Sequence, residues 1–245
     1  MQGAADYESY PDITNDVAPR INGTSRDDVI ELGPDTRWAY GAAGDDVITF
    51  ADTLPDQWRS VRIYGGDGDD EIIGRRFQER IEGGDGNDTL IGGGGGDVIF
   101  GGEGDDIFNS VDFPQIDGQP QAAQGDSLVA RDYSGHDTYI FDAGDRISNH
   151  LSSESIFDSY IQVHRDGDVN VAHIANFNLK LESLTVQTNS PTGVLGFIPT
   201  DDFIDLAPSV GGSGTYVTID GVPITFLREV TLDEARAANI TLERV

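Results

Sequence analysis

The chain has 245 residues, of which 44 are acidic and 15 are basic, so its formal net charge at pH 7 is −29. This charge argues against nucleic acid as a partner, and the absence of cysteine excludes disulfides and thiol catalysis. No apolar run is long enough to span a membrane, and the 37% of hydrophobic residues can fill the core of one long or two small domains.

A lead-in of residues 1–22 precedes a series of nine-residue units, and it lacks the apolar core that a secretory signal needs. The units begin with GTSRDDVIE at 23–31, LGPDTRWAY at 32–40 and GAAGDDVIT at 41–49, and an insertion at 50–55 follows. Five further units then run without a gap at 65–73, 74–82, 83–91, 92–100 and 101–109. A fixed period indicates one small unit stacked many times.

The unit GGDGNDTLI at 83–91 shows the pattern in full: glycine-glycine-x-glycine-x-acid-x-apolar-x. In the five contiguous units, the sixth positions are Asp70, Glu79, Asp88, Asp97 and Asp106, and the eighth are Ile72, Ile81, Leu90, Ile99 and Phe108. Glycine adopts positive φ freely, so the glycine-rich half predicts a tight turn with inward carbonyls, while the tail predicts a short strand. Stacked units would bury the apolar residues between two parallel sheets.

The stacked turns also predict an ion site. Neighbouring turns would lie about 4.8 Å apart, so an ion midway would be about 2.4 Å from each, which suits calcium–oxygen contacts. Magnesium requires shorter distances and a stricter octahedron, and a site without His or Cys is a poor one for zinc or copper.

The run from 65 to 109 resembles the calcium-binding nonapeptides of the RTX (repeats-in-toxin) family, and the likeness extends loosely over 23–149. The resemblance implies a parallel β-roll with two units per coil, in which calcium lies between turns n and n+2. It also implies that the sixth-position acid and turn carbonyls hold each ion. We expect about four to six ions. The expected metal-site residues are Asp28, Asp46, Gly66, Gly68, Asp70, Gly83, Gly84, Asp85, Gly86, Asp88, Gly93, Gly95, Asp97, Gly101, Gly102, Glu103, Gly104, Asp106 and Asp137.

Alternate units fall on opposite edges of such a roll. The first edge would carry Asp28, Asp46, Asp70, Asp88 and Asp106, with Asp137 of DYSGHDTYI at 132–140 extending the row. The second edge would carry Arg37, Glu79 and only one good turn, Gly92 to Asp97. We therefore hypothesise a calcium ladder on the first edge and a largely metal-free second edge.

The second edge also gathers both tryptophans of the chain and five of its 15 basic residues: Arg37, Trp38, Trp58, Arg59, Arg62, Arg75 and Arg76. Such a face is a candidate for binding an anionic polysaccharide, as the analogous modules of secreted alginate epimerases are thought to do. Alternatively, the arginines replace calcium as counter-charges and the tryptophans pack under the insertion.

Residues 110–131, with Pro114 and Pro120, predict a loop outside the roll. Near 150 the period changes from nine to two, so 150–245 is interpreted as an antiparallel β cap with a short helix. Hairpins are predicted at 160–174 and 216–227, with turns at Asp166–Gly167 and Asp220–Gly221. Thr231 and Glu234 predict a helix start, and ITLERV a last strand. The fold class is thus all-β: a parallel β-roll with an antiparallel C-terminal cap.

The search for catalytic groups gives little. His136, His150, His164 and His173 show no metal-protease spacing, and the GxSxG and phosphate-loop motifs are absent. A triad of His150, a nearby serine and Asp158 has no support beyond proximity in the sequence. We expect a non-catalytic, secreted calcium-binding module that folds outside the cell. By the resemblance, it is exported by type I secretion machinery with an uncleaved signal near the C-terminus. The alternative is an accessory domain or small enzyme acting on extracellular polysaccharide or lipid.

Overall fold

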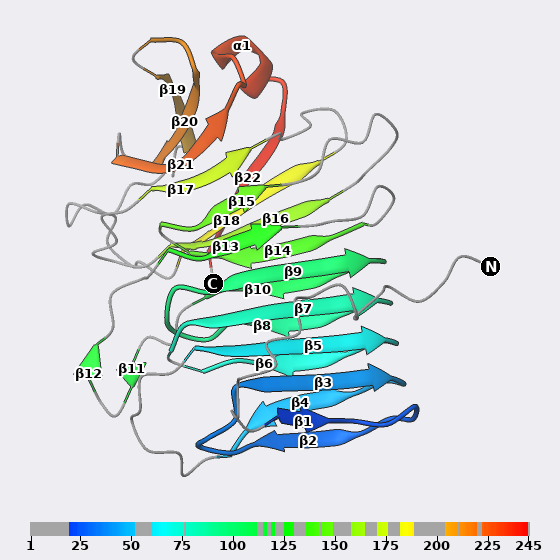
Figure 1. Cartoon of the computed structure of the whole chain (residues 1–245). Coiled ribbons are helices and arrows are strands. Elements are labelled where there is room, and N and C mark those ends of the chain that lie inside the picture. The colour runs from blue at the N-terminus through cyan, green and yellow to red at the C-terminus, as the bar shows by residue number, and fades with distance from the viewer. Residues whose placement is uncertain are drawn as a thin grey trace.

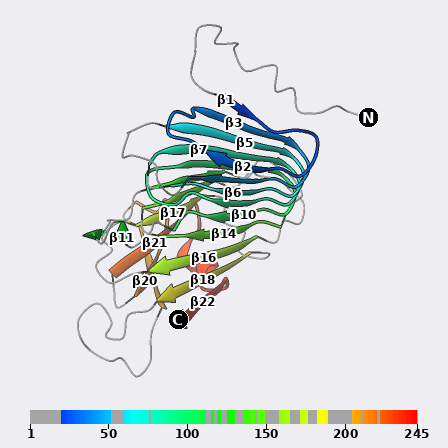
Figure 2. The same cartoon turned by 90° about the horizontal axis from the view of Figure 1, so that it is seen from below.

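A computed structural model describes residues 20–51, 60–75, 77–111, 115–116, 119–120, 125–129, 136–142, 144–148, 158–164, 171–175, 182–188, 204–209, 211–219 and 222–244. Within these residues, two long sheets run along one stack, with β1 and β2 at one end and β22 and α1 at the other (Figure 1). A view from below shows the same order, with β1 and β22 at opposite ends (Figure 2).

From β1 to β10 and from β13 to β18, successive strands alternate between the two sheets, so each pair of turns adds one layer. The first sheet has the order β1 (Arg20–Asn22), β3 (Trp38–Ala43), β5 (Val61–Asp67), β7 (Glu79–Asp85), β9 (Val98–Glu103), β13 (Ser127–Val129), β15 (Arg146–Ser148), β17 (Ala172–Ala175), β21 (Val222–Arg228), β20 (Gly214–Ile219) and β19 (Ile204–Pro208). The second has the order β2 (Val29–Leu32), β4 (Val47–Phe50), β6 (Glu71–Ile73), β8 (Thr89–Ile91), β10 (Ile107–Asn109), β14 (Thr138–Phe141), β16 (Ser159–His164), β18 (Ser183–Thr188) and β22 (Asn239–Arg244). A separate small hairpin joins β11 (Gln115–Ile116) to β12 (Gln119–Pro120).

The core is a pair of apolar columns between the sheets. In the first sheet Ile63, Ile81, Ile99 and Leu128 are successive register partners, and each is 0% exposed. The second sheet aligns Ile48, Ile72, Leu90, Phe108 and Tyr139, also each 0% exposed. Burial of such a side chain stabilises the fold by about 1.5–3 kcal/mol. The predicted parallel roll and the burial of the eighth positions are therefore confirmed.

The loop predicted over 110–131 is wrong at its C-terminal end. Strand β13 pairs in parallel with both β9 and β15, which makes residues 127–129 a full layer of the roll. Nine-residue counting missed this layer because the spacing between equivalent acids grows from 18 residues to 29 at this point.

The hairpin predicted at 160–174 is also wrong, because β16 and β17 belong to different sheets and each pairs in parallel. Parallel pairing continues past residue 150, through β18 and β22 in the second sheet and through β17 and β21 in the first. Among the described residues of this half, antiparallel pairing is confined to β19, β20 and β21, so the described cap is smaller than the one expected over 150–245.

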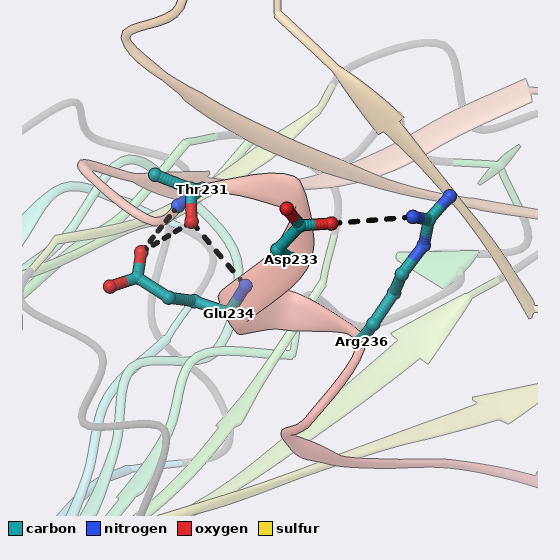
Figure 3. Close-up of polar contacts among 4 residues, drawn as sticks. All are labelled: Thr231, Asp233, Glu234 and Arg236. Atoms are coloured by element: carbon teal, nitrogen blue, oxygen red, sulfur yellow. Dashed lines mark hydrogen bonds and ion pairs between the residues drawn. The ribbon is translucent and has the colours of Figure 1, made fainter.

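Three C-terminal predictions are confirmed. Strands β20 and β21 form the hairpin expected at 216–227, with Ile219 opposite Val222. Helix α1 (Leu232–Ala235) begins at Thr231 with the expected capping box, in which Thr231 and Glu234 bond reciprocally (Figure 3). Residues 240–244 of the predicted last strand lie in β22, although its partner β18 runs parallel to it. In the described part of the chain, no helix is long and apolar enough to cross a membrane.

Candidate metal centre

A row of acids, all buried except the half-buried Asp28, follows the first edge of the roll, where each turn leads into a strand of the second sheet. Each backbone N–H in this row donates to the Oδ1 of the next acid. The distances are 2.7 Å for Asp28 to Asp46, 2.8 Å for Asp46 to Asp70, 2.9 Å for Asp70 to Asp88, 2.9 Å for Asp88 to Asp106, 3.0 Å for Asp106 to Asp137 and 3.0 Å for Asp137 to Asp158. The structure thus brings the predicted first-edge acids into one row and adds Asp158 to it.

The second carboxylate oxygen is unsatisfied in the middle of this row. Asp46, Asp70 and Asp88 are 1%, 2% and 1% exposed, and the Oδ2 of each is buried without a hydrogen-bond partner. A buried charge without a partner is costly. Burial and the neighbouring carboxylates raise the pKa of Asp70 to about 7. The hydrogen bond from the backbone N–H of the preceding acid lowers this pKa, but by less than burial raises it. Burial likewise raises the pKa of Asp88 to about 7.

The turns supply the rest of an oxygen-lined cradle. A Cβ placed on Gly65 or Gly83, the first residue of its repeat, would collide with the Oδ2 of Asp70 or Asp88. A Cβ on Gly84 would collide with the carbonyl oxygen of Gly66 in the preceding coil. The turn carbonyls therefore lie between the coils, close to the row of acids. Within the described residues, no three acidic or histidine side chains converge on one point, so backbone carbonyls must complete any ion's shell.

These residues fit calcium. The buried oxygen without a partner needs a positive charge, the donors are all oxygen, and glycine leaves the space that a side chain would fill. Calcium accepts six to eight oxygen ligands in flexible geometry, including backbone carbonyls. When bound, it would neutralise the buried carboxylates and join adjacent coils.

Positive φ at the second position of these repeats is required by the turn. The values are 93° at Ala42, 134° at Gly66, 141° at Gly84, 89° at Gly93 and 136° at Gly102. Ala42 is the exception in residue type, because a Cβ makes this region unfavourable. The sequence GAAGDDVIT therefore holds a strained alanine at a glycine position.

We predict that Ala42→Gly stabilises the calcium-loaded fold by about 1 kcal/mol, since the strain removed exceeds the entropy that glycine adds to the unfolded chain. Thermal unfolding in saturating calcium measures this. Ala43→Gly is the matched control, because Ala43 is not among the residues with positive φ, and it should destabilise by about 0.5–1 kcal/mol. Equal losses of stability in both variants would contradict the strain at Ala42.

An exposed second ladder accompanies the first edge, and the sequence analysis missed it. At the fifth position of each repeat, the side-chain oxygen accepts a hydrogen bond from a backbone N–H of the following coil. In the buried row the direction is reversed, because each side-chain oxygen there accepts from the preceding coil. The bonds join Asp45 to Asp27 (3.0 Å), Asp69 to Asp45 (3.0 Å), Asn87 to Asp69 (2.8 Å), Asp105 to Asn87 (2.9 Å) and His136 to Asp105 (2.8 Å), with the N–H donor named first. The signal was the repeated pair of acids or Asn-Asp at positions five and six.

The second edge carries more acids than predicted. The backbone N–H of Glu79 donates to Asp97 Oδ1 (2.7 Å), that of Asp97 to Asp126 (2.7 Å) and that of Asp126 to Asp145 (2.9 Å). All four acids are at most 1% exposed. The prediction that this edge has only one good turn is therefore incomplete, because Asp126 and Asp145 continue the row of acids. Each stands two residues before a buried apolar residue, Leu128 or Ile147, which is the signal that identifies them.

Other expected site residues lie outside the buried rows. The side chains of Asp85 and Glu103 are exposed, and their carbonyls accept the N–H groups of Gly68 (2.7 Å) and Gly86 (2.8 Å). A Cβ on Gly101 would collide with the Oδ2 of Asp106, as a Cβ on Gly83 would with the Oδ2 of Asp88. Gly95 and Gly104 have positive φ. The carboxylate of Asp158 belongs to the first-edge row, where its Oδ1 accepts the backbone N–H of Asp137 at 3.0 Å. His150 lies outside the described residues.

The predicted basic and aromatic face is only partly assembled. Arg62 lies over the ring of Trp38 at 4.4 Å, and Trp38 stacks with Tyr64, whereas Arg75 lies over Phe50 and Phe77. Arg37 immediately precedes β3 and is half-buried. Trp58, Arg59 and Arg76 lie outside the described residues.

The repeats also match a model of a known family. Residues 60–78 and 76–108 match the family model of the RTX calcium-binding nonapeptide repeat, in four copies. This stretch contains the turns of Asp70, Asp88 and Asp106 on the first edge and that of Asp97 on the second. No curated protein sequence matches the chain.

Proposed function

We propose, from the premise that residues 60–108 are RTX calcium-binding nonapeptide repeats, that the chain is a non-catalytic calcium-binding module of a secreted protein. Its roll would fold outside the cell as calcium binds. The observation that carries this proposal is the row of buried Oδ2 atoms without partners at Asp46, Asp70 and Asp88. Without cations these groups oppose the fold, and with calcium they hold adjacent coils together.

Calcium concentration would decide where the module folds. A site with a dissociation constant of about 10⁻⁴ to 10⁻³ M, typical of extracellular modules, stays empty at cytosolic calcium and fills at millimolar calcium. The formal net charge of −29 also repels the unfilled chain from itself. A chain that stays unfolded inside the cell suits export by type I secretion machinery, which the resemblance implies.

Calorimetric titration of the metal-free chain with calcium tests this function. We expect saturation at millimolar calcium, a stoichiometry of several ions and an enthalpy that includes folding, since binding and folding are coupled. Magnesium should bind more weakly, because it keeps its water and needs a stricter octahedron. No detectable calcium binding would contradict the proposal.

The alternative, an accessory domain or small enzyme, is tested on the same calcium-loaded protein. A panel of extracellular polysaccharides and lipid esters serves as substrate. We expect no turnover. Turnover that is lost in a folded His150→Ala variant would establish the alternative instead.

An outer face of the first sheet supports a second candidate function, the binding of an anionic polysaccharide. We define the arginine–aromatic face as Arg20, Trp38, Tyr40, Arg62, Tyr64, Arg80 and Phe100. Trp38 and Tyr40 flank the buried Ala39 on β3, so they lie on the side away from the core. Arg20 lies over Tyr40 (5.3 Å) and Arg80 over Phe100 (4.2 Å), which repeats the pairing of Arg62 with Trp38. The ion pair between Arg80 and Glu82 (3.6 Å) offsets part of the positive charge.

Binding of a polyuronate such as alginate to the calcium-loaded chain tests this second function. Arg20→Ala combined with Arg62→Ala should lower the affinity by about tenfold or more, since charge pairing and ring contact are both lost. Arg228→Ala is the control, because it removes an exposed arginine on β21 that pairs with Glu229. No measurable affinity of the unmodified chain would remove this candidate.

A further inference from the structure

The first-edge acids do not all present a free oxygen, and the residue at the second position of the repeat accounts for part of the difference. In the repeat of Asp28 this position is Thr24. Its backbone N–H and its hydroxyl donate to Asp28 Oδ2 at 2.6 Å and 2.8 Å. The oxygen that is bare in Asp70 and Asp88 is therefore satisfied in Asp28 from within its own repeat.

The backbone conformation explains this contrast. Gly66 and Gly84 hold the second position with φ near 140°, and no hydrogen bond reaches the Oδ2 of their repeats. Thr24 is not among the described residues with positive φ, and its N–H reaches the carboxylate. The same bond recurs on the second edge, where the Arg75 N–H donates to Glu79 Oε2 at 3.2 Å. A second-position residue without positive φ thus accompanies a self-satisfied acid in both repeats, whereas Ala42, with φ of 93°, leaves the Oδ2 of Asp46 bare.

A different residue acts at Asp137, the last acid of the row before Asp158. The hydroxyl of Tyr139 donates to Asp137 Oδ2 at 3.2 Å. Tyr139 occupies the eighth position, where the preceding first-edge units have Ile30, Ile48, Ile72, Leu90 and Phe108, none of which has a hydroxyl, and where the next layer has Tyr160. Its ring is 0% exposed and stacks on Phe108 at 4.7 Å and on Tyr160 at 5.1 Å, which holds the hydroxyl in place.

We propose that the calcium ladder of the first edge is closed at both ends by the protein itself. Asp46, Asp70 and Asp88 bind calcium through Oδ2, and Asp106 joins them, since its repeat has a glycine of positive φ at position 102 and Phe108 at the eighth position. Asp28 and Asp137 bind no ion through Oδ2, because Thr24 and Tyr139 take the place of the metal. This inference rests on the proposed function for the presence of calcium.

A physical reason favours closed ends. An ion between two coils needs oxygen ligands from both, and in the described part of the chain no acid of the row precedes Asp28. Asp28 is half-buried, and a bare carboxylate there would lose part of its hydration, whereas one that accepts two hydrogen bonds regains polar partners. Solenoids generally need ends that differ from their repeating middle.

Counting bound ions tests the inference. Native mass spectrometry of the full chain, loaded with calcium, gives the number of ions in the unmodified protein and in each variant. Asp28→Asn should leave the number unchanged, and Asp70→Asn should lower it by at least one. Tyr139→Phe should raise it by one, because the Asp137 Oδ2 loses its donor while the ring packing stays. Loss of an ion in Asp28→Asn, or an unchanged number in Tyr139→Phe, would overturn the closed ladder.

A crystal structure of the unmodified chain grown in calcium gives an independent readout that requires no variant to fold. Anomalous density is expected beside the Oδ2 atoms of Asp46, Asp70 and Asp88, and none beside those of Asp28 and Asp137. Density beside all five would overturn the closed ladder while leaving the proposed function intact. A protein that binds no calcium at all would instead refute the proposed function, and the ladder with it.

Discussion

Removing calcium from the folded chain at pH 8 is expected to unfold the roll. Each filled site contributes about 1–3 kcal/mol at about 10 mM calcium, if its dissociation constant is typical of extracellular modules. Summed over several sites, this is comparable with the whole stability of an ordinary domain, about 5–15 kcal/mol. The loss should be large because the bare carboxylates of Asp46, Asp70 and Asp88 remain buried in the empty fold. Circular dichroism should show the β-sheet signal disappear in EDTA and return when calcium is restored.

Two controls separate ion binding from general screening of charge. Sodium chloride at about 0.5 M screens the net charge of −29 but cannot fill an oxygen-lined slot, so it should restore little of the signal. Magnesium at equal concentration should restore less than calcium does. An unchanged unfolding temperature after exhaustive chelation would contradict both the prediction and the proposed function.

The part of the fold that could be predicted from the sequence is the part where spacing is regular. Between Asp70 and Asp106 equivalent acids recur every 18 residues, so glycine positions, acids and apolar residues all support one register. Farther along, the spacing becomes 31 and then 21 residues, because insertions of different lengths enter the coils. A fixed period cannot follow such insertions, although the layers themselves continue.

One local signal survives those insertions. Asp126, Asp145 and Asp158 each precede a buried apolar residue by two positions, as Asp70 precedes Ile72. The glycines of the first, second and fourth repeat positions are lost there, so the units no longer resemble repeats. A turn such as Asp166–Gly167 is equally typical of a hairpin and of a roll, because both need a tight reversal. Only the pairing of β16 and β17 with other strands distinguishes the two.

The metal row was easier to predict than its ends. The sixth-position acids could be predicted because an acid recurs at the same position of the repeats. The hydrogen bonds from Thr24 and Tyr139 depend on single residues that replace a glycine and an aliphatic side chain. Nothing in the spacing alone shows that these side chains reach a carboxylate, so the closed ends could be seen only in three dimensions.

Acidifying the calcium-free chain is expected to restore structure that it lacks at pH 8. Burial raises the pKa of Asp70 and of Asp88 to about 7 and that of Glu79 to about 8. These values lie above those of the unfolded chain, so the folded state keeps protons that the unfolded state has released. The contribution of these groups to stability is fully present below about pH 4 and is lost as pH rises to about 8. In EDTA, the β-sheet signal should therefore grow as pH falls from 8 towards 5. Calcium affinity should fall over the same range, because protons compete for the carboxylates.

A matched pair of neighbouring substitutions separates this effect from the general loss of negative charge on acidification. Asp70→Asn and Asp69→Asn each remove one charge, and each keeps an oxygen that can accept the backbone hydrogen bond of its ladder. Asp70 is 2% exposed, whereas Asp69 is exposed. At pH 8 without calcium, Asp70→Asn should stabilise the roll, because no buried charge remains at that position. In saturating calcium the same change should destabilise it, because the ion loses a ligand. Asp69→Asn should change stability little in either condition. Equal effects of the two substitutions would show that net charge, rather than the buried row, controls folding.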